Sequence, residues 1–226
     1  MDLDAAKRLV AREALKLLPP SGIIGLGTGS TANFFVQALA ELVGAGRSLV
    51  GVATSTASRD LAIRVGIPLL DEEGPWEIDV CVDGADEVSP TLDVIKGRGG
   101  AHTREKIVNR ASRTNVIVVD ESKLSDRLGE NCRVPVEVLR FGHKTTALTL
   151  GRYGEPELRL RDGQPFLTDS GQLIYDLTVE PISDPAQLDR ELAGIPGVVG
   201  TGLFCNCIDV VLVATPVQVR QLRRPT

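Results

Sequence analysis

Short apolar runs alternate with longer amphipathic segments through the first 120 residues of this chain. Runs of this length suit buried strands, and the segments between them carry apolar residues at helical spacing. This alternation predicts a parallel sheet that is covered by helices on both faces. The expected strands are 22–26, 48–53, 68–70, 78–82 and 115–119, and the expected helices are 3–17, 31–43, 57–65 and 103–111.

The pattern changes near Gly129, after which apolar and polar residues alternate with a period of two. This pattern predicts an inserted, antiparallel α+β lobe, completed by a return to the first domain through an apolar strand and a C-terminal helix. We therefore expect an α/β fold with a doubly wound, mostly parallel sheet. Residues 1–129 plus 206–226 would form the main domain, and residues 130–205 the smaller lobe. The lobe's expected elements are strands 134–138 and 157–160, a hairpin over 165–175 that turns at Asp169 to Gly171, and helices 144–153 and 185–193.

The charge of the chain limits its partners. Its 226 residues carry a formal net charge of −5, which argues against nucleic acid or an anionic membrane as a partner. No apolar run approaches the roughly 20 residues of a membrane span, and the acidic N-terminus is unlike a signal peptide. We therefore expect that any phosphorylated ligand is held by local cations.

A glycine-rich segment follows the first strand and precedes a helix. Its pattern is Gly25-x-Gly27-x-Gly29, and hydroxyls come from Thr28, Ser30 and Thr31. Backbone amides at such a junction can converge on an anion, so the segment is a candidate phosphate cradle. A dinucleotide fingerprint would need glycine at position 30. The alternative is a tight turn in which Ser30 caps the helix.

Two carboxylates follow the strand 78–82, in the sequence Asp83-Gly84-Ala85-Asp86. Ligands of open parallel sheets gather at the carboxyl ends of the strands. The pair can bind sugar hydroxyls, act as acid and base, or hold Mg²⁺, with which the nearby Lys96 would compete. A solvated acidic turn remains the other interpretation.

A second glycine-rich segment, Lys96-Gly97-Arg98-Gly99-Gly100, allows close approach of a ligand to the backbone. It leads into a helix that has Glu105 in its first turn, where a glutamate also stabilises the helix dipole. Lys123 follows the strand 115–119 and should lie at the same edge of the sheet. Cys205-x-Cys207 could bind a soft metal, but buried thiols in a reducing cytosol are the preferred interpretation.

Together these motifs closely resemble those of the type A ribose-5-phosphate isomerases. The resemblance spans nearly the whole chain, in order and at the expected spacing. It implies a Rossmann-like domain with an inserted α+β lobe, in a cytoplasmic homodimer or homotetramer that needs no metal and no cofactor. It rests on residues 27–31, 83–87, 96–101, 104–107, 120–123, 135–138, 166–169 and 202–204.

The resemblance also implies roles for individual residues. Glu105 matches the family's proton-transfer base in the pentose phosphate pathway reaction, which interconverts ribose 5-phosphate and ribulose 5-phosphate through a cis-enediolate. Lys96 would stabilise the developing negative charge, and Asp83 would open the sugar ring. The residues implied to contact the substrate are Thr28, Gly29, Ser30, Thr31, Asp83, Gly84, Ala85, Asp86, Lys96, Gly97, Arg98, Gly99 and Lys123.

The chain departs from the family pattern at His102-Thr103, where apolar residues are usual. We expect His102 to face solvent, and the alternative is that it tunes the pH response of Glu105 three residues later. Two other functions compete with an isomerase. A non-catalytic, sugar-phosphate-binding regulatory domain would not need Glu105, and a nicotinamide oxidoreductase is disfavoured by Ser30.

Overall fold

The computed structural model describes residues 3–215 and 218–224. The chain divides into two compact units: the first comprises residues 1–85, 104–122 and 207–226, and the second comprises residues 86–103 and 123–206. No helix among the described residues is long and apolar enough to cross a membrane.

The first unit contains a six-stranded sheet in the order β15-β14-β6-β3-β1-β2. All neighbours pair in parallel except β14 and β15. This agrees with the predicted doubly wound, mostly parallel sheet. Its strands are β1 (Gly22–Leu26), β2 (Leu49–Ala53), β3 (Ile78–Asp83), β6 (Ser112–Asp120), β14 (Val210–Ala214) and β15 (Val219–Arg223).

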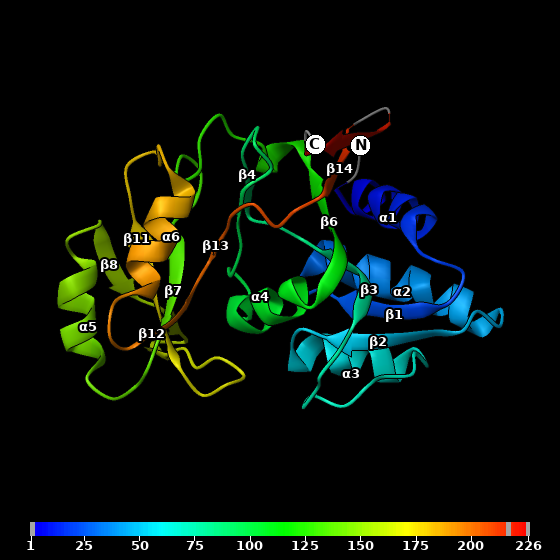
Figure 1. Cartoon of the computed structure of the whole chain (residues 1–226), viewed down its shortest axis with the longest axis horizontal. Coiled ribbons are helices and arrows are strands. Elements are labelled where there is room, and N and C mark those ends of the chain that lie inside the picture. Colours follow the sequence, from blue (N-terminus) through cyan, green and yellow to red (C-terminus); the bar gives the residue numbers. More distant parts are fainter. Residues whose placement is uncertain (1–2, 216–217, 225–226) are drawn as a thin grey trace. The chain divides into compact units, whose positions relative to one another are not determined.

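Helices cover both faces of this sheet (Figure 1). On one face, the helices before and after β1 pack through Val10 and Phe35 against strand residues such as Ile24 and Val118. On the other face, Val108 packs with Cys81. Successive strand residues point to opposite faces, which explains how continuous apolar runs fill both cores. The helices are α1 (Leu3–Ala14), the 3-10 turn η1 (Leu15–Leu17), α2 (Ser30–Gly44), α3 (Thr56–Arg64) and α4 (His102–Arg110).

The second unit is built mainly of antiparallel sheets, as the period-two alternation predicts. A four-stranded sheet has the order β12-β7-β11-β8, a three-stranded sheet the order β13-β5-β4, and β9 and β10 form a hairpin. Their buried residues form one core, which includes Ile95, Val136 and Leu203. The strands are β4 (Glu87–Val88), β5 (Val94–Ile95), β7 (Val134–Val138), β8 (Glu155–Leu158), β9 (Leu160–Arg161), β10 (Gln164–Pro165), β11 (Leu173–Thr178), β12 (Val198–Thr201) and β13 (Leu203–Phe204).

The helices of the second unit are α5 (His143–Leu150) and α6 (Pro185–Ala193), with the 3-10 turn η2 (Glu121–Lys123) at its border. Helix α6 begins where its sequence indicates, because Asp184 caps it by accepting the N–H of Gln187 at 2.9 Å. Pro185 is tolerated at the first helical position, because the backbone N–H that proline lacks would have no partner within the helix there. The predicted helix 185–193 is therefore confirmed at both ends.

The two units differ from the predicted domains in where residues 86–103, 123–129 and 206 fall. All of them belong to the second unit. Strands β4 and β5 pair with each other, and β5 pairs with β13. The buried carboxylate of Glu87 also accepts the N–H groups of Gly129 and Asn131, at 2.8 and 2.9 Å. These contacts tie both segments to the antiparallel part of the chain.

Two predicted elements of the first unit differ in the structure. The prediction of a C-terminal helix is wrong, because strand β15 lies there instead, antiparallel to β14. Strand 68–70 is reduced to a single bridge between Gly51 and Leu69. At the C-terminus, pairing with the open edge of β14 outweighs the local helical pattern. Residues 68–70 do lie beside β2, but they pair with it only around Gly51.

Candidate active site

The predicted phosphate cradle lies between β1 and α2. Gly29 is the N-cap residue of α2, with φ of 109° and no side-chain cap, and Ser30 is the first helical residue. The alternative in which Ser30 caps the helix is therefore wrong. Gly29 and Ser30 are exposed and Thr31 is half-buried, so the amides at the start of α2 are open to an anion.

Asp83, the last residue of β3, is locked to this cradle. One oxygen of its buried carboxylate accepts the N–H of Thr28 at 2.9 Å and the N–H of Gly84 at 2.7 Å. Gly27 makes this approach possible, because a Cβ there would collide with the carboxylate. The cradle and Asp83 thus form one rigid group within the first unit.

A cluster of hydroxyl groups beside the cradle was missed in the sequence. The hydroxyl oxygen of Thr28 lies 2.8 Å from those of Thr54 and Ser55 and 3.2 Å from that of Ser58. Ser58 in turn donates to the carbonyl of Gly27 at 2.6 Å. The signal was present, because Thr54 and Ser55 directly follow β2 and parallel strands end at the same edge of a sheet.

Glu105 lies in the first turn of α4, and its side chain is only 4% exposed. One turn later, Val108 packs against Cys81 and Gly25, where a Cβ would lie 2.9 Å from atoms of both neighbours. The absence of a side chain at Gly25 therefore lets α4 lie close to β1 and β3. Glu105 therefore lies on a firmly packed helix.

The second glycine-rich segment belongs to the second unit, together with Asp86. The N–H of Lys96 donates to Gly202 at 2.9 Å, and its ammonium lies 5.6 Å from the ring centroid of Phe204. Asp86 accepts the N–H of Arg98 at 2.9 Å. Lys96 is 4% exposed, whereas Arg98 is exposed. A buried ammonium on a glycine loop can stabilise an oxyanion.

His102 is completely buried, so the expectation that it faces solvent is wrong. Its ring takes the space beside Gly97, where a Cβ would lie 2.7 Å from Nδ1. Gly97 has φ of 111°, a conformation that favours glycine. His102 therefore packs behind the loop of residues 96–100.

Lys123 ends η2 and is half-buried. The next residues are held by a bridge between Val88 and Leu124 and by the N–H of Ser125, which donates to Val88 at 3.0 Å. The predicted site residues thus fall into two groups. The first unit holds Thr28 to Thr31, Asp83 to Ala85 and Glu105, and the second holds Asp86, Lys96 to Gly99 and Lys123.

The second unit has two notable cavities. One of about 320 Å³ is lined by Asp86 and Arg98 of the predicted site, with Arg159 and Asp176 among its other residues. Neither of the latter was singled out in the sequence.

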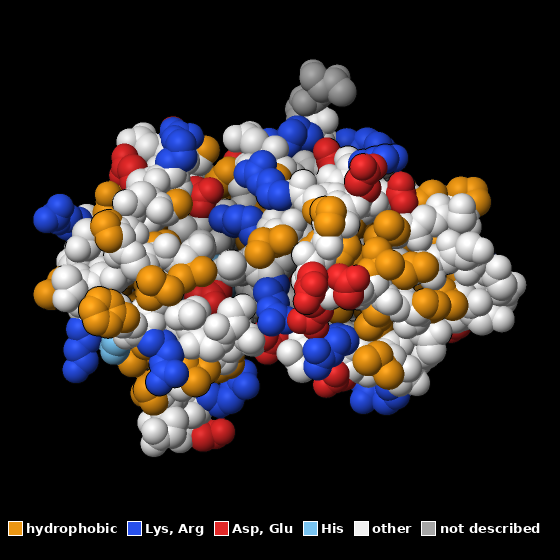
Figure 2. Space-filling model, turned by 60° about the horizontal axis from the view of Figure 1, so that its bottom comes forward, with side chains coloured by type: hydrophobic (Ala, Val, Ile, Leu, Met, Phe, Trp, Pro, Cys, Tyr) orange, Lys and Arg blue, Asp and Glu red, His pale blue; other side chains and the backbone are white. Residues whose placement is uncertain are grey.

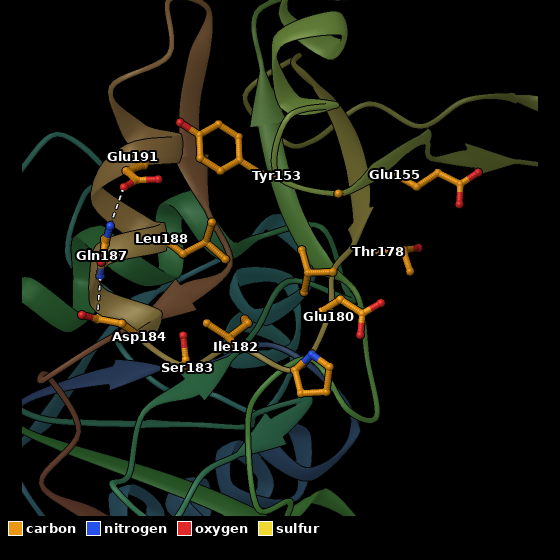
Figure 3. A pocket seen from close by; sticks show the side chains of 13 residues that line it. Tyr153, Glu155, Thr178, Glu180, Ile182, Ser183, Asp184, Gln187, Leu188 and Glu191 are labelled. Carbon is orange, nitrogen blue, oxygen red and sulfur yellow. Dashed lines mark hydrogen bonds between the residues drawn. The ribbon is translucent and has the colours of Figure 1, made fainter.

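The larger cavity, of about 580 Å³, contains none of the predicted site residues (Figure 3). Carboxylates line it, and none of its lining residues is lysine or arginine. In Figure 3, Gln187 links Asp184 and Glu191 by hydrogen bonds. Because carboxylates repel an anion, this cavity is unsuited to a phosphorylated ligand. Its acidic residues are Glu155, Glu180, Asp184 and Glu191.

The model of one protein family, ribose 5-phosphate isomerase A (phosphoriboisomerase A), matches residues 50–218. The chain belongs to the ribose-5-phosphate isomerase A family. The known reaction of this family is the interconversion of ribose 5-phosphate and ribulose 5-phosphate. The chain is therefore an isomerase, and the non-catalytic regulatory domain is not favoured.

Relatives in this family match over almost the full length. The ribose-5-phosphate isomerase A of Thermomicrobium roseum is 45% identical over 227 residues, covering 99% of this chain and 96% of the relative. That of Gloeobacter violaceus is 46% identical over 216 residues, covering 95% and 94%.

Solved structures of family members agree with the fold. A ribose-5-phosphate isomerase in complex with phospho-erythronic acid is 40% identical, with a TM-score of 0.95 over 99% of this chain and 100% of the other. The isomerase from Plasmodium falciparum is 34% identical, with a TM-score of 0.94 over the same shares. This likeness confirms the predicted α/β fold class.

Proposed function

We propose that this chain interconverts D-ribose 5-phosphate and D-ribulose 5-phosphate through a cis-enediolate, with Glu105 as the base. The observation that carries the assignment is a buried glutamate on the first turn of a helix that packs tightly on the sheet. Glu105 removes the proton from C2 of the aldose and returns it to C1. A positioned base of this kind contributes roughly 10²–10⁴ in rate.

Lys96 and the amides of its glycine loop stabilise the oxyanion in this proposal. The burial of Lys96 supports the role, since a charge acts more strongly where water is excluded. One such donor contributes about 3–4 kcal/mol to the transition state. Asp83 opens the furanose ring, and Asp86 orients the sugar hydroxyls, together with the backbone of Gly84 and Ala85.

The phosphate binds in the cradle and to Lys123. The N–H of Thr28 is already donated to Asp83. We therefore assign the phosphate to the amides of Gly29 to Thr31 and the hydroxyls of Ser30 and Thr31. Thr28 contributes by fixing Asp83 beside the substrate. Lys123 at the phosphate and Lys96 at the oxyanion then supply local positive charge in a chain of net charge −5.

We also propose that the reaction needs no metal or cofactor, and that the enzyme is a cytoplasmic homodimer or homotetramer. Lys96 takes the place at the oxyanion that a metal would take elsewhere. For assembly, the face drawn in Figure 2 carries hydrophobic side chains among charged ones. The second unit exposes Phe141 to 94% and Leu148 to 81%, which supports the predicted oligomer contact on the inserted lobe.

Proton NMR of the protein with ribose 5-phosphate in D₂O and EDTA tests the mechanism. We expect the parent to form ribulose 5-phosphate that carries deuterium at C1, and Glu105→Gln to form almost none. Glu41→Gln, which changes an exposed glutamate near the end of α2, is the matched control and should behave as the parent. Conversion by Glu105→Gln at the parental rate would exclude Glu105 as the base. Binding without any conversion by the parent would favour the regulatory domain.

A further inference from the structure

Arg159, which follows β8, reaches the glycine loop of residues 96–100. Its guanidinium donates from Nη1 to the carbonyl of Gly97 at 2.7 Å and to the carbonyl of Arg98 at 3.2 Å. All these residues belong to the second unit. Arg159 therefore contacts the backbone of the loop that carries Lys96.

Asp176 on β11 holds the other edge of the same guanidinium. Nε of Arg159 donates to one carboxylate oxygen at 2.8 Å, and Nη2 donates to the other. Both side chains are largely buried, with exposed fractions of 15% and 20%. A two-bond pair of this kind fixes orientation as well as distance.

The sheet fixes where this pair forms. Asp176 is paired with Glu157 across β11 and β8. Arg159 comes two residues later, just past the end of β8, where its N–H still donates to the carbonyl of Ile174 on β11 at 2.9 Å. Such diagonal positions on one face of a sheet are within reach of long side chains. The guanidinium is thus anchored to a regular element.

Two other contacts also restrain the loop of residues 96–100. The carbonyl of Gly97 also accepts the N–H of Gly100 at 2.9 Å. Gly100 lies against the ring of Phe166, where any Cβ would collide. Arg159 adds the contact that fixes the carbonyl directions at Gly97 and Arg98. The cavity of about 320 Å³ is lined by this pair together with Asp86 and Arg98.

We propose that Arg159, oriented by Asp176, is a positioning residue for isomerisation. By holding the carbonyls of Gly97 and Arg98, it sets the direction of the loop amides and of Lys96 toward the enediolate oxygens. The inference rests on the proposed role of Lys96. Misplacing a catalytic group by about 1 Å can cost about 10²-fold in rate. The loss of this contact should therefore lower kcat.

Arg159→Lys tests the geometry, because lysine keeps the charge but lacks the planar fork of five donors. It cannot bind both oxygens of Asp176 and both loop carbonyls. We expect kcat to fall about 10- to 100-fold, while KM for ribose 5-phosphate changes less than about 3-fold because the phosphate binds elsewhere. Hydrogen exchange at the amides of residues 97–100 should become faster.

Arg133→Lys is the matched control. Arg133 pairs with Glu157 on the same sheet, but that pair is exposed and no bond from it to the glycine loop is seen among the described residues. We expect kcat and loop exchange to stay within about 2-fold of the parent.

Asp176→Asn is a second variant, which tests the inference if Arg159→Lys proves unstable. It should also lower kcat. The double variant should have a kcat no lower than that of Arg159→Lys, because both substitutions disrupt the same Arg159–Asp176 pair. Parental kcat and exchange in either folded variant would overturn the inference. Lys96→Met is measured alongside: if it keeps parental activity, the proposed role of Lys96 fails instead.

Discussion

At the scale of single residues, close backbone approach and burial set the chemistry of the candidate site. Asp83 is bound by two backbone N–H groups, which fix the position of its carboxylate. The glycine pattern of the cradle could be recognised in the sequence. The contact between Gly27 and Asp83 could not, because it joins two strands whose register is set only by the folded sheet.

Asp83→Asn and Lys123→Ala should separate catalysis from binding. Asparagine keeps the size of the side chain but cannot accept a proton from the sugar, so we expect kcat to fall about 10²-fold or more. Lys123→Ala removes the proposed phosphate contact and should mainly raise KM, about 10-fold. Steady-state kinetics with ribose 5-phosphate measures both effects, and the reverse pattern would mean that the two roles are exchanged.

Gly27→Ala should displace Asp83. The added methyl group would occupy the position of the carboxylate, so we expect kcat to fall at least about 10-fold and stability to drop by about 1–3 kcal/mol. Gly44→Ala is the control, because its Cβ would point into open space at the end of α2. Enzyme assays and urea unfolding measure kcat and stability for both variants. Equal values in Gly27→Ala and Gly44→Ala would contradict the prediction.

Cys132 should react slowly with alkylating reagents. Burial, and then the neighbouring charge of Glu87, raise the pKa of its thiol above the ordinary value. The thiolate is the reactive form. At pH 8 we therefore expect iodoacetamide to label Cys132 at least about 10-fold more slowly than in urea, with the rate still rising above pH 9. Mass spectrometry follows the labelling, and a plateau below pH 9 would contradict the raised pKa.

At the scale of elements, caps and turns could be recognised wherever the signal is local. Pro185 after Asp184 marks the start of α6. The hairpin of β9 and β10 carried an Asp-Gly signal that was overlooked: Asp162 and Gly163 both have positive φ, as this turn requires. Strand β15 had no such signal, because its pairing depends on the open edge of β14.

Asp184→Ala should destabilise α6. The side chain satisfies the N–H of Gln187, and losing such a cap costs about 1 kcal/mol. Glu191→Ala on the same helix removes only a surface bond from Gln187 and should cost a few tenths of a kcal/mol. Urea titrations compare the two unfolding free energies. An unfolding free energy of Asp184→Ala equal to that of the parent would show that the cap is unimportant.

At the scale of the whole molecule, neither unit is one continuous segment. The chain passes between the units after residues 85, 103, 122 and 206. The sequence change near Gly129 correctly indicated an inserted antiparallel part, but not that residues 86–103 belong with it. Among those residues, β5 pairs with β13, which is more than 100 residues away. Such a pairing cannot be recognised from the local sequence. Arg159 was missed for the same reason.

These repeated crossings should make unfolding cooperative. If one unit unfolded alone, it would leave closed loops tethered to the other, which limits the entropy gained. The fluorescence of Trp76 reports on the first unit, and pulsed alkylation of the buried Cys205 reports on the second. We expect both probes to give the same urea midpoint. Labelling of Cys205 at clearly lower urea would show that the second unit opens independently.

The parallel pairing of β14 with β6 has a consequence for the synthesis of the chain. Asn115 and Asp209, which hydrogen-bond at the start of this pair, are 94 positions apart. At about 5–20 residues per second, a ribosome needs roughly 5–20 s to make the intervening segment. During that interval the edge of β6 lacks its partner, and an open apolar edge invites aggregation. The nascent protein is therefore exposed to aggregation at this edge until its last strands emerge.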